Sequence, residues 1–129
     1  MKFKFILFIS SILLLNSTII YSQDIYLTPR PQKLITGNSS IKINSETQIV
    51  FDDNSKTIAL NLQEYFKNNF RLNLKTTDFQ ELKINFINFQ IDRSLAEESY
   101  KLSISKNKVT ITAKNKTGLF YGTQTLMQL

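Results

Sequence analysis

Two adjacent runs, residues 99–105 and 108–114, alternate between apolar and polar side chains, and this pattern restricts the fold more than any other. The Lys106-Asn107 dipeptide between them can form a two-residue turn, since Asn tolerates a positive φ. The resulting pairs are Ser105 with Lys108, Ile104 with Val109, Leu102 with Ile111 and Tyr100 with Ala113. Every apolar side chain then lies on one face, and a shift of one residue would destroy the match. The sequence therefore predicts a half-buried antiparallel hairpin.

A second pattern predicts an amphipathic helix over Lys56–Phe70. Apolar residues recur there at spacings of three and four, which places them on one helical face. They are Ile58, Ala59, Leu62, Tyr65, Phe66 and Phe70. The preceding residues 52–55 offer several side chains that can cap a helix N-terminus.

The remaining patterns predict further strands and a second helix. The strands are expected at 41–43, 47–51, 71–76 and 82–91. In the last of these the apolar residues change face, which suggests a bulge or a strand covered on both sides. The helix is expected over Thr117–Gln128, with Thr117 as N-cap. Gly122 costs ~1 kcal/mol relative to Ala inside a helix, so we expect its backbone to lie close to the sheet or to another domain.

Together these elements predict a single α+β domain with a mostly antiparallel sheet and two helices packed on one face. The last predicted helix stops at the end of the sequence without a capping glycine or a following loop. We therefore expect the sequence to be part of a longer chain.

Residues 1–22 have the layout of a secretory signal peptide. Lys2 and Lys4 precede an apolar run over 5–15, and cleavage is expected after the small Ser22. A retained membrane anchor is the alternative, but polar residues interrupt the ~20 largely apolar residues that a span needs. The mature domain would be residues 23–129, exported to the periplasm or the cell exterior. Loss of the two lysines lowers its net charge from +6 to +4.

Composition excludes several kinds of catalytic site. The sequence has no Cys and no His, which excludes a thiolate nucleophile, a Ser-His-Asp triad and a His-containing zinc site. It also has no phosphate-binding loop and no cluster of metal ligands. We therefore expect no cofactor and no metal.

The only adjacent acidic pairs are Asp52-Asp53 and Glu97-Glu98. Asp52-Asp53 stands where a helix favours capping groups and negative charge. Glu97-Glu98 leads into a strand, in which adjacent side chains point to opposite faces. These positions favour structural roles over acid–base catalysis.

Other candidate binding residues also have simpler interpretations. Phe120 and Tyr121 could touch a sugar, but their place beside Leu119 favours core or interdomain contacts. Two N-glycosylation patterns, at 38–40 and 115–117, matter only in a host with that machinery. Five lysines lie on the polar side of the hairpin and could bind an anionic polymer: Lys101, Lys106, Lys108, Lys114 and Lys116. The aromatic side chains that a nucleic-acid-binding surface needs are absent. We therefore expect a solvated face and no nucleic-acid partner.

Three motifs occur in an order that is familiar from one enzyme family. They are T-P-R-P at 28–31 followed by Gly37, E-S-Y-K-L-S-I at 98–104, and G-L-F-Y-G-T-Q-T-L-M-Q-L at 118–129. Over Ile25–Leu129 the sequence resembles the N-terminal accessory domain of bacterial β-N-acetylhexosaminidases of glycoside hydrolase family 20. Related accessory domains occur in other glycosidase families. The resemblance implies an α+β layer with a mostly antiparallel sheet and helices on one face.

The resemblance also implies that catalysis takes place elsewhere. In that family an Asp-Glu pair in a downstream (β/α)8 barrel acts with the 2-acetamido group of the substrate. No residue of this sequence matches that pair, so we expect no catalytic, cofactor-binding or metal-binding residue here.

Two functions from different classes remain. The first is the non-catalytic N-terminal domain of an exported β-N-acetylhexosaminidase, which braces the barrel and meets glycans only through it. The second is a free-standing exported binding module of the same fold. In either case, contact with a membrane is expected only through the signal peptide during export.

Overall fold

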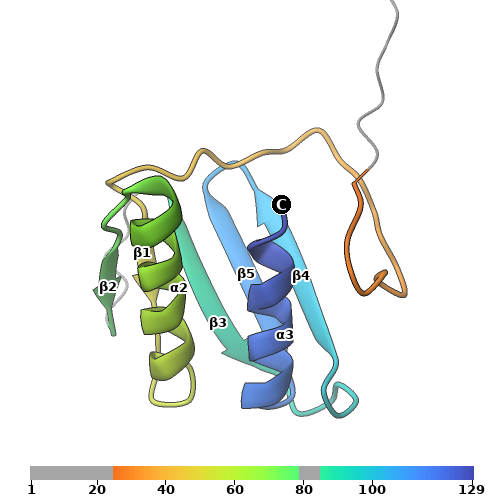
Figure 1. The fold of residues 1–129 in the computed structure, drawn as a ribbon. Helices are drawn as coiled ribbons and strands as arrows, with labels where there is room; N and C mark the ends of the chain where they lie inside the picture. Colours follow the sequence, from red (N-terminus) through yellow and green to blue (C-terminus); the bar gives the residue numbers. More distant parts are fainter. Residues whose placement is uncertain (1–24, 79–84) are drawn as a thin grey trace, which may run out of the picture.

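The structure, a computed structural model, describes residues 25–78 and 85–129 and consists of one sheet with two helices on one of its faces (Figure 1). The predicted signal peptide lies outside the described residues. None of the described helices has the length and apolar character that crossing a membrane requires. In chain order the elements are β1 (Gln48–Val50), α2 (Lys56–Phe70), β2 (Lys75–Thr77), β3 (Phe86–Ile91), β4 (Tyr100–Ser105), β5 (Lys108–Ala113) and α3 (Lys116–Leu126).

The two strongest sequence patterns are confirmed. The helix α2 has the predicted bounds. The strands β4 and β5 form the predicted hairpin in the predicted register, with Leu102 opposite Ile111 and Tyr100 opposite Ala113. The α+β class and the placement of both helices on one face are also confirmed (Figure 1). The helix α3 begins one residue earlier and ends two residues earlier than predicted.

The prediction of a mostly antiparallel sheet is wrong. The strand order is β2-β1-β3-β5-β4, and only the β4–β5 pair is antiparallel. The pairs β1–β2, β1–β3 and β3–β5 are parallel. The helix α2 carries the chain back along the sheet, so β2 runs in the same direction as β1. The hairpin adds its second strand, β5, to β3, which leaves β4 at the edge.

Some predicted strands are shorter or absent. Residues 41–43 form no strand; Ile41 and Ile43 instead pack against the core, ahead of a turn in which Thr47 donates to the Asn44 carbonyl. Only the end of the segment predicted at 71–76 pairs, as β2, because the chain is still leaving α2 through Arg71, which has a φ of 57°.

The expected bulge in the strand predicted at 82–91 is not found between Phe86 and Ile91, where pairing with β5 is continuous. Ile84 lies outside the described residues. Phe86 is on the face opposite the helices, where the Lys108 ammonium lies 5.5 Å from its ring centre. Ile87 is fully buried.

The core lies between the sheet and the two helices. Its fully buried members from the sheet are Ile49, Ile87, Val109, Ile111 and Ala113. The helix α2 contributes Ile58, Ala59, Leu62 and Phe66, and α3 contributes Leu119 and Leu126. Removal of this apolar surface from water is the main force that holds the helices on the sheet.

The predicted close approach at Gly122 is confirmed, and it is made to the sheet. A Cβ atom at Gly122 would lie 2.5 Å from Cγ2 of Ile111 and 3.1 Å from Cδ2 of Tyr100. Gly118, one turn earlier, is tighter, because a Cβ there would lie 2.5 Å from the backbone carbonyl oxygen of Ser99. No pattern in the sequence predicts this contact at Gly118.

Replacing Gly122 with valine is therefore expected to destabilise the domain. Helix propensity alone would favour Val by a few tenths of a kcal/mol, but overpacking against Ile111 costs ~1–3 kcal/mol. The Gly122→Val variant should unfold at a lower urea concentration than the unmodified chain. Gly37→Ala is the matched control, because a Cβ at Gly37 meets no atom within 4 Å. An unchanged or higher midpoint for Gly122→Val would contradict the packing role.

Candidate functional site

Asp52 and Asp53 lie in the turn that leads into α2, and of the two only Asp52 forms hydrogen bonds there among the described residues. Its Oδ1 accepts hydrogen bonds from the Ser55 hydroxyl at 2.6 Å and from the Ser55 N–H at 2.9 Å. The Asp52 N–H donates to the Ser55 Oγ in return, at 2.9 Å. Ser55 occupies the N-cap position, but its side chain makes no capping bond to the helix. The expected cap is therefore replaced by a closed Asp–Ser turn that starts the helix.

This turn shifts the titration of Asp52. Partial burial acts to raise the pKa of the Asp52 carboxyl, but the hydrogen bonds from Ser55 and Asn54 outweigh it and leave that pKa lowered. The carboxyl is therefore held in its ionised form. A general acid needs a proton near neutral pH, so this environment opposes that role.

Glu97 supports the start of α3. Its carboxylate accepts a hydrogen bond from Asn115 Nδ2 at 2.7 Å and forms a salt bridge with Lys114 at 2.6 Å. The other end of the Asn115 carboxamide, Oδ1, accepts from the Gly118 N–H at 3.0 Å. The N-cap is thus Asn115 and not the predicted Thr117, because the Asn115 backbone is extended and its oxygen reaches the first turn. Glu97 has a structural role.

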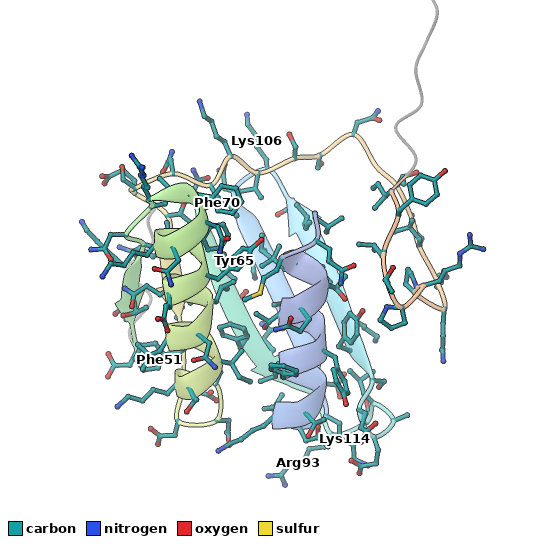
Figure 2. All side chains as sticks on the ribbon, in the orientation of Figure 1. Phe51, Tyr65, Phe70, Arg93, Lys106 and Lys114 are labelled. Carbon is teal, nitrogen blue, oxygen red and sulfur yellow. The ribbon has the colours of Figure 1, made fainter. Side chains whose placement is uncertain are left out.

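The five lysines of the hairpin region do not form one patch. Figure 2 shows Lys106 and Lys114 at opposite ends of the hairpin. Lys114 is paired with Glu97, and Lys108 lies over the Phe86 ring. Hydrogen bonds from Ser94 lower the pKa of the Asp92 carboxyl, and the charge of Lys101 adds a smaller lowering. Within the described ranges, no group of three or more acidic side chains could hold a metal ion.

The face of the sheet opposite the helices is open and largely polar. The strands β3, β5 and β4 present Asn88, Gln90, Thr110, Thr112, Lys101, Ser103 and Ser105 there. Neighbouring side chains satisfy one another: the Thr110 hydroxyl donates to Asn88 Oδ1 at 2.9 Å. Such a face is stable in water without a covering layer.

The exposed face of α3, unlike the polar face of the sheet, carries aromatic side chains. Phe120 is 45% exposed and Tyr121 is 42% exposed, and their ring centres lie 5.9 Å apart. These residues are therefore not part of this domain's core, which was one of the two predicted roles. Beyond Lys116 the helix carries no charged residue. Protein interfaces are depleted in charge and enriched in aromatic side chains at their centres, so this face has the composition of a contact surface.

Two tyrosines fix the last turn of α3. The Tyr65 hydroxyl, from α2, donates to the Met127 carbonyl at 2.8 Å. The Tyr100 hydroxyl, from β4, lies 2.5 Å from the Thr125 hydroxyl. Figure 2 shows Tyr65 on the side of α2 that faces α3. The exposed face of α3 therefore belongs to a helix that is anchored to both α2 and β4.

Comparison with known proteins gives a consistent result. Residues 24–129 match the family described as "Glycosyl hydrolase family 20, domain 2". The chain is 33% identical over 112 residues to a β-hexosaminidase of Porphyromonas gingivalis, covering 84% of this chain but only 14% of that protein.

Solved structures agree with this match. One neighbour is a family 20 exo-β-N-acetylglucosaminidase of Vibrio harveyi, with a TM-score of 0.67, 22% identity and coverage of 78% of this chain and 15% of that one. Another is a β-hexosaminidase of Streptomyces plicatus, with a TM-score of 0.63 and 27% identity. That match covers 72% of this chain and 19% of the Streptomyces chain.

The Asp52 turn predicts a pH-dependent contribution to stability. Because its folded-state pKa is lowered, the contribution is present above the ordinary value of 3.8 and is lost as the pH falls through the folded-state pKa. At pH 7, Asp52→Asn should lower the free energy of unfolding by about 0.5 kcal/mol, a small value because the carboxyl is largely exposed. By about pH 2 the difference should largely disappear. Urea unfolding at both pH values measures it.

The neighbouring Asp53→Asn variant is the control. Asp53 is exposed and makes no hydrogen bond within the described part of the chain, so its substitution should have little effect at pH 7. Equal losses of stability in the two variants would mean that net charge, and not the turn, is responsible.

Proposed function

This chain belongs to the family of second domains of glycosyl hydrolase family 20, and from this membership we propose that it is the accessory domain of an exported β-N-acetylhexosaminidase. The full-length enzyme, which we call the parent, would remove terminal N-acetylhexosamine residues from glycans. Catalysis would take place in a downstream (β/α)8 barrel, and this domain would brace that barrel without touching the substrate. The observation that carries the proposal is the family match over residues 24–129.

The alternative, a free-standing binding module, is not favoured. The chain spans 14% of its Porphyromonas relative and 15% and 19% of the Vibrio and Streptomyces enzymes. In these relatives the domain is one part of a longer enzyme.

The exposed face of α3 is the part of this domain that suits contact with the barrel. It is uncharged beyond Lys116 and carries Phe120 and Tyr121. Leu129, beyond its end, is 55% exposed and adds to the apolar surface. The open face of the sheet is polar and satisfies its own side chains, so it has less to gain from being covered.

Export is also part of the proposal. The basic and apolar segments of residues 1–22 support a signal peptide cleaved after Ser22, which would place the parent enzyme in the periplasm or outside the cell. The absence of cysteine means that this domain needs no disulfide in an oxidising compartment.

A hydrolysis assay on the parent gene product tests the proposed function. The chain extended to its natural C-terminus should hydrolyse a chromogenic N-acetylglucosaminide and should be recovered outside the cytoplasm, beginning at Gln23. Residues 23–129 alone should give no turnover, because the catalytic pair is expected in the barrel. Host hexosaminidase must first be removed, and a parallel preparation from cells without the gene is the control. Turnover by residues 23–129 would contradict the proposal, as would an inactive parent chain.

A charge placed on α3 tests the proposed contact with the barrel. In the parent chain, Phe120→Asp should lower stability by ~1–3 kcal/mol, the range for an aromatic side chain central to an interface. In the isolated domain the same change should cost less, since Phe120 is already 45% exposed there. Calorimetric unfolding of both chains measures the difference. Ser103→Asp, on the open sheet face, is the control and should have little effect in either chain.

A further inference from the structure

The segment before β1 is held to the rest of the domain at few points. Residues 25–35, which we call the strap, expose large apolar side chains: Tyr26 is 82% exposed and Ile35 is 77% exposed. Within the described residues, hydrogen bonds tie residues 25–43 to the rest of the domain at only two places. One joins Thr28 to Gln128, and in the other the Lys42 carbonyl accepts from Asn85.

The contact between Thr28 and Gln128 is reciprocal. The Thr28 N–H donates to Gln128 Oε1 at 2.9 Å, and Gln128 Nε2 donates to the Thr28 carbonyl at 3.0 Å. A carboxamide has the same donor and acceptor as a peptide group. One side chain therefore satisfies both backbone groups of a residue that is 100 positions away in the sequence.

Gln128 is itself held in place. Its Nε2 also donates to the Gln124 carbonyl at 3.3 Å, one turn earlier. The adjacent Met127 carbonyl accepts from Tyr65, and Thr125 is bound by Tyr100. The strap is thus attached just beyond the C-terminal end of α3, the helix that carries Phe120 and Tyr121.

We propose that Gln128 is a positioning residue that clasps the strap to the C-terminal end of α3, so that the apolar side chains of both form one surface for the catalytic barrel. The part concerning the barrel rests on the proposed function above. In water the two exposed hydrogen bonds of the clasp are weak, because water competes for the same groups. Covering by the barrel would exclude that water and strengthen them.

Limited trypsin digestion of the parent chain tests the clasp. Lys33 is exposed and is the cleavage site that the strap offers, because proline follows Arg30. Losing both hydrogen bonds in Gln128→Ala should raise the rate of cleavage after Lys33 about fivefold or more. Gln128→Glu keeps the acceptor for the Thr28 N–H but loses the donor, so its rate should fall between those of the unmodified chain and Gln128→Ala.

Gln124→Ala is the matched control, because this glutamine lies one turn earlier, in α3, and its side chain is exposed and makes no hydrogen bond within the described residues. Its cleavage rate should equal that of the unmodified chain. Hydrogen exchange at the Thr28 amide provides a second measurement and should quicken in Gln128→Ala alone. Equal rates for Gln128→Ala and Gln124→Ala in both measurements would overturn the clasp.

These outcomes separate the clasp from the proposed function. If the unmodified parent chain has no hexosaminidase activity, the proposed function fails, but the cleavage rates still decide whether Gln128 holds the strap. If the parent is active and the isolated domain shows the same protection at Lys33 as the parent, the clasp stands but its covering by the barrel is overturned.

Discussion

The close approach of α3 to the β4–β5 hairpin is the contact on which the rest of the domain depends. Gly118 and Gly122 are one turn apart on one face of the helix, and neither adds a side chain of its own between the helix and the sheet. The helix axis can therefore lie near the strands, which brings Leu119 and Leu126 into the core. The same helical geometry turns Phe120 and Tyr121 away from the sheet. The glycines thus set both what α3 buries and what it exposes.

Sequence patterns predicted the elements whose formation depends on residues close together in the chain. The α2 helix follows from a run of apolar spacings, and the hairpin register follows from alternation on both sides of a two-residue turn. Strand direction in the rest of the sheet depends on partners far away in the sequence. The pairs β1–β3 and β3–β5 could not be read from either strand alone, so the one visible hairpin suggested an antiparallel sheet. The α2 crossover directly accounts for the parallel β1–β2 pair alone.

Composition excludes kinds of chemistry more readily than it predicts what individual side chains do. A sequence without His and Cys excludes whole classes of chemistry. The use of Glu97 was not predictable, because its role depends on Asn115, which lies 18 positions away across the hairpin. Asn115 is itself a favoured N-cap residue, but Thr117 is also of a capping type, and the sequence pattern pointed to Thr117. Phe120 and Tyr121 follow a buried leucine, so only the packed helix shows that they face outward.

The position of α3 at the end of this element order also has a consequence for how the domain folds. The β4–β5 hairpin joins residues that are close in sequence, so it can form early. Its inner face, with Val109 and Ile111, is covered only when the following helix has been made. During synthesis this apolar face stays open to water and to other chains, which is the usual origin of aggregation in incomplete domains. Closure of this domain is therefore a late event, and its yield should depend on how quickly α3 reaches the sheet.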